Sequence, residues 1–188
     1  MNRTIIKLFF YLCILTALPS YAQNAVHYYF KTMDIRNGLS QNTVYQILQD
    51  RKGFMWFGTK DGLNRYDGLS YRVYKKENSG LGKNFITALY EDHEGNIWIG
   101  TDGGVFIYNP VLDSFTAFNQ TSDKGTVIKD FVTMIGSDEY DNIWISVENQ
   151  GLFCYNHEKR LRNYLHDSGM SNAVSYTHLR AHETGAYL

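Results

Sequence analysis

The stretch Gly53–Tyr66 reads GFMWFGTKDGLNRY, and the other parts of the chain are best understood by comparison with it. It returns as GNIWIGTDGGVFIY over Gly95–Tyr108 and, more loosely, as DNIWISVENQGLFCY over Asp141–Tyr155. The tryptophans of consecutive copies are 42 and 46 residues apart. A repeat period of about 40–50 residues is typical of propellers and solenoids, in which one small structural unit recurs along the chain.

Each copy predicts four short β-strands. An alternating run surrounds the tryptophan, and a second run ends in tyrosine. A third run opens twelve residues before each tryptophan with a β-branched residue, at Val44, Ile86 and Val132. A fourth run follows each tyrosine, at residues 71–74, 115–118 and 161–165. Because apolar residues do not recur at helical spacing, the prediction is all-β: a partial β-propeller of about three four-stranded antiparallel blades.

The repeated residues have structural interpretations. Glycine at the first hairpin turn allows positive φ, and aspartate takes this place in the third copy; the residues are Gly53, Gly95 and Asp141. Glycine recurs in the second turn at Gly62, Gly104 and Gly151. The tryptophans are interpreted as wedges between neighbouring blades, in preference to ligand-stacking residues: Trp56, Trp98 and Trp144. The tyrosines are expected to pack while their hydroxyls find polar partners: Tyr66, Tyr108 and Tyr155.

These positions resemble the two-component regulator propeller repeat. The resemblance begins at Asn37–Val44 and continues through Gln49-Asp50, Gly53, Trp56–Thr59, Gly62-Leu63 and Tyr66–Gly68. The segment Gly80–Tyr108 matches nearly as well. The third copy departs from the pattern: Asp130 stands at the asparagine position, Ser146-Val147 replaces Gly-Thr, and one residue is inserted before Gly151. Together the copies cover about residues 37–173.

The resemblance implies a function for the parent protein. Such repeats build the periplasmic sensors of hybrid two-component proteins, especially in Bacteroidetes. These sensors usually have two seven-bladed propellers, an immunoglobulin-like domain, a membrane span, a histidine kinase and often a DNA-binding output domain. The chain is then the N-terminal fragment of a sensor anchored in the inner membrane. It would help to detect an oligosaccharide, namely a glycan fragment, and to pass the signal to a phosphorelay. Its partners would be the remaining blades of the parent propeller. The resemblance also implies a possible homodimer of the intact parent.

The ends of the chain differ from the repeats. Residues 1–22 predict a cleaved signal peptide, with the cut between Ala22 and Gln23 and a periplasmic product; an uncleaved membrane anchor is the alternative. Residues 23–39 predict a strand, at Val26–Met33, and a linker. The blades are expected at about 40–80, 82–125 and 128–168 within residues 40–173. Residues 174–188 look like foreign sequence, and a metal role for His178 and His182 is disfavoured.

The sequence suggests no catalytic residues, metal ligands or cofactor, and leaves the ligand-binding residues unknown. Aspartates recur six residues before each tryptophan, at Asp50, Asp92 and Asp138, where a turn-capping role explains the repetition better than catalysis. Cys154 is interpreted as a small buried hydrophobe. A formal net charge of −1 disfavours nucleic-acid binding. The alternatives to a non-enzymatic sensor are a propeller lyase or hydrolase, or a non-catalytic protein-interaction propeller.

Overall fold

The computed structural model describes residues 28–164. The chain divides into two compact units, residues 1–32 and 33–188. Of the first unit only residues 28–32 are described, and they form neither helix nor strand. The expected signal peptide, its cleavage site and the tail over 174–188 lie outside the described residues, so their interpretation stays a prediction.

The second unit contains three sheets of four short strands each. The first sheet consists of β1 Val44–Gln49, β2 Met55–Thr59, β3 Gly62–Tyr66 and β4 Tyr71–Tyr74. The second consists of β5 Ile86–Glu91, β6 Ile97–Thr101, β7 Gly104–Asn109 and β8 Ser114–Ala117. The third consists of β9 Val132–Ser137, β10 Ile143–Val147, β11 Gly151–Tyr155 and β12 Leu161–Tyr164.

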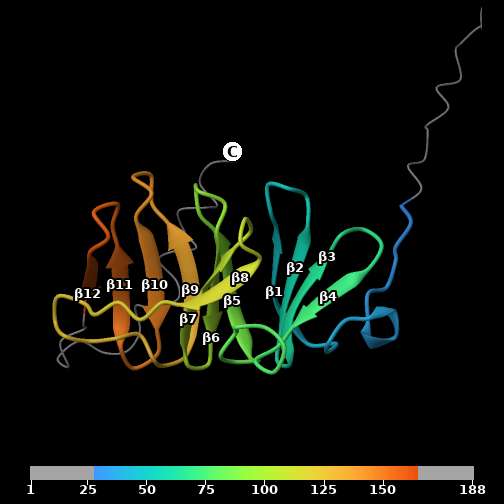
Figure 1. The fold of residues 1–188 in the computed structure, drawn as a ribbon, viewed down its shortest axis with the longest axis horizontal. Helices are drawn as coiled ribbons and strands as arrows, with labels where there is room; N and C mark the ends of the chain where they lie inside the picture. Colours follow the sequence, from blue (N-terminus) through green and yellow to red (C-terminus); the bar gives the residue numbers. More distant parts are fainter. Residues whose placement is uncertain (1–27, 165–188) are drawn as a thin grey trace, which may run out of the picture. The chain divides into compact units, whose positions relative to one another are not determined.

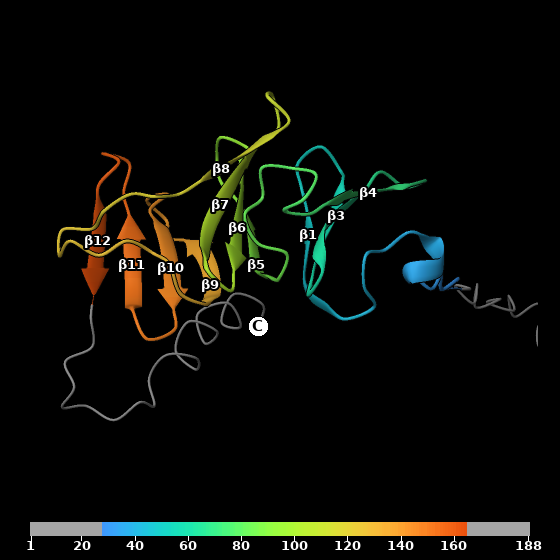
Figure 2. The same cartoon turned by 60° about the horizontal axis from the view of Figure 1, so that its bottom comes forward.

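Every sheet is an antiparallel meander in which strands adjacent in sequence are adjacent in space. The second sheet lies between the other two, because β5 contacts both β1 and β9 (Figure 1). Figure 2 shows the same side-by-side order from another direction. The predicted all-β fold with three four-stranded antiparallel blades is therefore confirmed.

The hairpins repeat the same backbone conformations. Gly53 has φ 88° and Gly95 has φ 84°, and Asp141 adopts φ 60° at the corresponding position of the third sheet. This left-handed conformation suits glycine, and aspartate tolerates it better than most residues. The first turn of each blade thus has one shape although its residue changes.

The first strand of every blade carries a β-bulge that the sequence pattern did not reveal. In β1, Val44 pairs with Thr59 and Gln46 pairs with Gly58, so Tyr45 is the extra residue. The same shift leaves Thr87 extra in β5 and Thr133 extra in β9. A bulge bends its strand and redirects the extra side chain. In each blade the bulge lies near the start of the first strand, next to the connection that leads into the blade.

Two apolar cores join the blades. The core between the first and second sheets contains Trp56, Leu63, Leu89 and Tyr108, and the core between the second and third contains Trp98, Phe118, Val132 and Phe153.

A glycine contact tightens each junction between the sheets. An added Cβ at Gly58 would lie 2.8 Å from Cγ2 of Ile86, and one at Gly100 would lie 2.6 Å from Cγ1 of Val132. A side chain at either glycine would hold the neighbouring blade away. In the third sheet this position is Ser146, whose hydroxyl bonds with that of Thr133 at 2.9 Å.

The expected N-terminal strand over residues 26–33 is wrong for its described part, residues 28–33. A short apolar run is an ambiguous signal of a strand when it is read from the sequence alone. The chain instead forms a short 3₁₀ helix, η1, at Ile35–Asn37, capped by Asp34. Leu39 follows the helix and packs against Phe57 in a small core.

Candidate functional site

The two ends of the sheets are built differently. One end, here called the aspartate face, carries the turns between the first and second strands of each blade: residues 50–54, 92–96 and 138–142. The opposite end, called the loop face, carries the turns between second and third strands: residues 60–61, 102–103 and 148–150. The connections that lead into each blade also lie there: residues 38–43, 75–85 and 118–131.

One carboxylate organises each turn of the aspartate face. Asp92 accepts hydrogen bonds from the backbone N–H of Asn96 and from the indole N–H of Trp98, both at 2.8 Å. The other blades repeat the bond to the indole, Asp50 to Trp56 at 2.8 Å and Asp138 to Trp144 at 2.9 Å. The predicted capping of the turn is confirmed, and the bond to the indole N–H is an additional feature that the sequence did not predict. These carboxylates hold a turn to a tryptophan.

The environment of Asp138 shows how strongly such a carboxylate is held. Burial raises its pKa, but hydrogen bonds from the side chains of Asn142 and Trp144 and from backbone N–H groups outweigh burial and lower the pKa to about 2. The ionised form is therefore the one that the fold stabilises, which suits a structural acceptor and does not suit a general acid near neutral pH.

The three tryptophans are not equally enclosed. Trp56 is 1 % exposed and Trp98 is 3 % exposed, each between two sheets. Trp144 is only partly buried, and its ring lies 5.6 Å from that of Tyr164 in the same blade. The expected role as a wedge between blades therefore describes the arrangement of Trp56 and Trp98, and Trp144 differs because no described sheet covers it.

The repeated tyrosines also have separate surroundings. Tyr66 donates a hydrogen bond to the carbonyl of Gly68 at 2.5 Å. Tyr108 donates to Asp113 at 2.7 Å and accepts from Arg65 of the neighbouring blade at 2.9 Å. Burial and the bond to Asp113 raise the pKa of Tyr108. The Tyr108 hydroxyl therefore links two blades as a neutral group. Tyr155 contributes its ring to the core beside Trp98.

Cys154 pairs with Trp144 across the third sheet and is buried. Burial raises the pKa of its thiol, which disfavours the reactive thiolate. Among residues 28–164, no group of three or more histidine, cysteine, aspartate or glutamate side chains is placed to hold a metal ion. Within the same range, no helix has the length and apolar character needed to cross a membrane.

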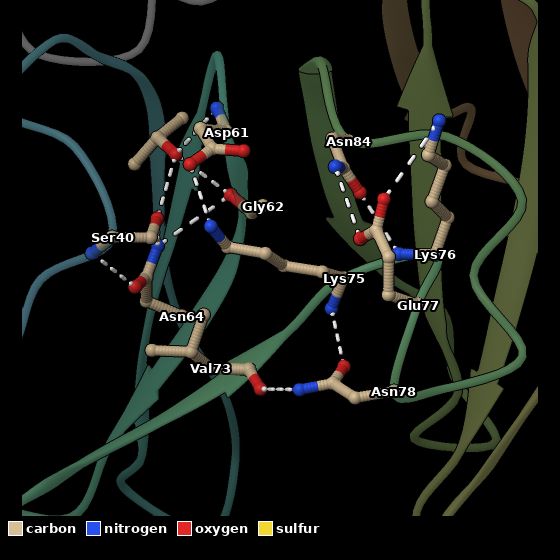
Figure 3. A network of polar contacts seen from close by, with 11 residues as sticks. Ser40, Asp61, Gly62, Asn64, Val73, Lys75, Lys76, Glu77, Asn78 and Asn84 are labelled. Carbon is tan, nitrogen blue, oxygen red and sulfur yellow. Dashed lines mark hydrogen bonds and ion pairs between the residues drawn. The ribbon is translucent and has the colours of Figure 1, made fainter.

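The loop face carries an ordered polar network (Figure 3). Lys75 forms an ion pair with Asp61 at 2.6 Å. Asn84 accepts from the backbone N–H of Lys76 at 2.8 Å and donates to Glu77 at 3.3 Å. These bonds fix the connection between the first and second blades.

A second group of bonds in Figure 3 anchors the segment that enters the first blade. The buried side chain of Asn64 accepts from the backbone N–H of Ser40 at 2.8 Å and donates to the Ser40 hydroxyl at 2.8 Å. The Ser40 hydroxyl also bonds with that of Thr59 at 2.9 Å. The entering segment is therefore fixed against β2 and β3.

Backbone hydrogen bonds link the loops of neighbouring blades. The N–H of Gly62, in the first blade, donates at 2.7 Å to the carbonyl of Asn84, which leads into the second blade. The next carbonyl, of Phe85, accepts from Asp102 at 3.3 Å. Residues 84–85 are thus held between the turns of two blades, and a displacement of this segment would affect both.

Three aromatic rings from different blades form a row on the loop face. The ring centroids of Tyr45 and Phe85 are 4.8 Å apart, and those of Phe85 and Phe131 are 5.6 Å apart. Tyr45 is 47 % exposed, and the two phenylalanines are partly exposed. We call Tyr45, Phe85 and Phe131 the aromatic row. Aromatic side chains with a few polar groups nearby are common components of ligand-binding sites.

The local sequence explains where these rings lie. Phe85 and Phe131 each stand directly before the first residue of a blade, Ile86 and Val132. This shared register, phenylalanine directly before the β-branched first residue of a blade, is a signal in the sequence that could have located both rings. Tyr45 occupies the bulge of β1, so its position could not be read from simple strand alternation.

The fold is that of part of a β-propeller. Residues 38–61 and 80–103 match the family "Two component regulator propeller". These segments are therefore two-component regulator propeller repeats, as the resemblance had indicated.

Solved structures support the same assignment. An extracellular domain from B. thetaiotaomicron assigned to the hybrid two-component system BT3049 is 28 % identical, with a TM-score of 0.64 over 71 % of this chain and 20 % of that chain. The extracellular domain of BT4673 from the same organism is also 28 % identical, with a TM-score of 0.60 over 69 % of this chain and 20 % of that chain.

A curated relative links the repeats to a kinase. The protein "Histidine kinase P4" of Formosa agariphila is 42 % identical over 59 residues, which are 31 % of this chain and 4 % of that protein. The chain thus spans about one fifth of the solved domains and a small part of the kinase. Its similarity to extracellular sensor domains of two-component systems is established, and the ligand is not specified by any of these relatives.

Proposed function

We propose that the chain is the N-terminal part of a periplasmic glycan sensor in a hybrid two-component system. In this proposal a signal peptide exports the chain, further blades complete the propeller, and a membrane-anchored histidine kinase receives the signal. We refer to that longer protein as the intact sensor. The chain itself binds or positions ligand and carries no catalytic module.

The observation that carries the ligand class is the composition of the loop face. An oligosaccharide presents apolar C–H faces that pack on aromatic rings and hydroxyls that need hydrogen-bond partners. The aromatic row offers the first kind of surface. The exposed side chains of Lys60, Lys83 and Asp102 offer ammonium and carboxylate groups on the same face. A mixed aromatic and polar surface on ordered loops fits a sugar better than an apolar ligand.

The aspartate face is a poorer candidate for ligand binding. Its repeated carboxylates already accept hydrogen bonds from the backbone and from tryptophan. A lyase or hydrolase would need acids that are free to exchange protons with substrate. The repeated acids of these blades are instead committed to their turns, which favours the sensor over the enzyme.

The test is a binding survey of the intact sensor with a panel of neutral and acidic oligosaccharides, measured by calorimetry. Each mixture is also examined by chromatography for cleavage. We expect saturable binding of at least one oligosaccharide without cleavage. Cleavage products that depend on the protein would support the enzyme alternative, and no binding across the panel would contradict glycan sensing.

A further inference from the structure

One side of the third sheet is exposed, although the corresponding sides of the other two sheets are covered. Cross-strand pairing places Met134 opposite Ser146, Ser146 opposite Leu152, and Leu152 opposite Tyr164, so these side chains share one side of the sheet. Trp144 lies on the same side, two residues before Ser146 on β10. We call this side, with Met134, Trp144, Leu152 and Tyr164, the open face.

Matched positions are buried wherever a following blade is present. The rings of Tyr74, Phe118 and Tyr164 each lie beside the tryptophan of their own blade. Tyr74 is 4 % exposed and Phe118 is 8 % exposed, but Tyr164 is 47 % exposed. Likewise, Ala88 is 4 % exposed on β5, whereas Met134 is 41 % exposed at the same place on β9. Large apolar side chains exposed together indicate a surface that a partner covers.

The two complete junctions between blades show which side chain covers such a surface. Between ring centroids, Tyr108 of the second blade lies 5.0 Å from Trp56 and 5.9 Å from Tyr74 of the first. Tyr155 of the third blade repeats this arrangement, at 5.7 Å from the tryptophan of the second blade and 5.1 Å from Phe118. Each junction therefore contains three rings, and the third ring is a tyrosine from the following blade.

The open face provides two of these three rings and a positive charge. The ring centroids of Trp144 and Tyr164 are 5.6 Å apart. Arg162, the second residue of β12, is exposed and forms no ion pair within residues 28–164. Arg72 is the second residue of β4, and its Nη1 lies 2.7 Å from Oδ2 of Asp113 in the following blade. A carboxylate at the position of Asp113 in a further blade would therefore meet Arg162.

The geometry points to the open face as the docking surface for one further blade of the same repeat. That blade lays a tyrosine ring against Trp144 and Tyr164 and brings a carboxylate to Arg162. This inference rests on the proposed function, in which further blades complete the propeller. It adds the surface on which the next blade docks and the two side chains that this blade must supply.

Serine at the junction position makes this docking differ from the other two in one respect. An added Cβ at Gly58 or Gly100 would lie 2.8 Å or 2.6 Å from a side chain of the following blade. Ser146 already has a Cβ at this position, and its hydroxyl bonds with that of Thr133 at 2.9 Å. The facing residue of the further blade is therefore smaller than valine or lies farther away than in the other junctions.

Hydroxyl-radical footprinting of the intact sensor tests whether the open face is covered. Mass spectrometry gives the oxidation rate of each side chain in the native sensor and in urea, and the ratio of the two rates measures its protection. Tyr74 is the buried reference, and Tyr140, 71 % exposed on the aspartate face, is the exposed reference. We expect Met134 and Tyr164 to be protected as strongly as Tyr74. Tyr164 as reactive as Tyr140 would overturn the proposal.

A photo-cross-link then identifies what covers the face. p-Benzoylphenylalanine replaces Tyr164, or Tyr140 in the control, in a mixture of isotopically light and heavy sensors. We expect a cross-link within one chain to the next repeat, whose tyrosine follows Tyr155 by about 40–50 residues. A cross-link between chains would assign the face to a second copy, and one to another part of the same chain would assign it to another domain; either overturns the proposal. So would cross-links from position 164 that are no more specific than those of the control. A cross-linked repeat with no carboxylate at the position of Asp113 would refute the partner assigned to Arg162.

These measurements do not depend on the ligand, so their failure and the failure of glycan sensing can be distinguished. A sensor that shows the protection and the cross-link but binds no oligosaccharide would contradict glycan sensing and support the docking surface. A sensor that binds an oligosaccharide but leaves Tyr164 unprotected would contradict the docking surface and support glycan sensing.

Discussion

Replacing Gly100 by alanine tests how tightly the second and third blades are joined. The new Cβ would lie 2.6 Å from Cγ1 of Val132, 2.9 Å from its Cβ and 3.0 Å from the Cβ of Ala88. Val132 is fully buried, and its β-branched side chain has few alternative rotamers. The clash can be relieved only if β9 moves away from β6. Overpacking of this kind costs about 1–3 kcal/mol of unfolding free energy.

A double-mutant cycle identifies the contact responsible. Val132→Ala alone removes two buried methyl groups and should cost about 1.5–3 kcal/mol. In the Gly100→Ala, Val132→Ala double variant, the added methyl group occupies space left by valine. The double variant should therefore be at least about 1 kcal/mol more stable than the sum of the single effects. Urea unfolding of this chain, followed by tryptophan fluorescence, gives the required free energies.

Gly136→Ala is the matched control for this cycle. Gly136 lies in β9, and an added Cβ there has no atom within 4 Å. Its substitution should change the unfolding free energy by no more than about 0.5 kcal/mol. Strictly additive effects of the Gly100 and Val132 changes would refute the close contact between these blades, and so would a Gly100→Ala variant as stable as the control.

Three other predictions concern the tryptophans, the aspartate turns and export. Trp98→Ala should cost about 3–5 kcal/mol and Trp144→Ala clearly less, because only Trp98 is enclosed by two blades; equal losses in urea unfolding would contradict this order. The pKa of Asp138 is lowered to about 2, so the stabilising effect of its carboxylate is complete above about pH 4 and is lost as the pH falls toward 2. Asp138→Asn should therefore flatten this part of the curve of unfolding free energy against pH. An unchanged curve would contradict the stabilising role of the carboxylate. The exported product should begin at Gln23, and intact-mass measurement showing retained residues 1–22 would favour the anchor.

The blades could be predicted because each local signal recurs in the same register. Tryptophan, the first-turn residue and the second-turn glycine keep their order in all three copies, and the strand runs follow from them. The substitution of Asp141 for glycine preserved the turn, since its φ of 60° matches what that turn needs. Repetition thus supplied evidence that a single strand pattern would not give.

The parts that were missed depend on contacts between distant residues. Tyr45, Phe85 and Phe131 come together because three blades place their first strands side by side, and the bulge at Tyr45 leaves little trace in the sequence. The pattern at residues 26–33 resembled a strand, but residues 28–33 form none in the structure, and a short apolar run does not by itself determine pairing. The spacing of aspartate and tryptophan showed repetition without showing the bond between them.

Ligand-dependent phosphorylation tests the central functional claim most directly. The intact sensor is placed in membrane vesicles with the blades accessible. Incorporation of phosphate from ATP is then measured during titration with an oligosaccharide that binds in the survey of neutral and acidic oligosaccharides. The account predicts a saturable change in phosphorylation, with Tyr45→Ala requiring about tenfold more ligand for half the effect. Phosphorylation that stays constant at ligand concentrations that saturate the binding site would contradict the claim that these blades serve a glycan sensor.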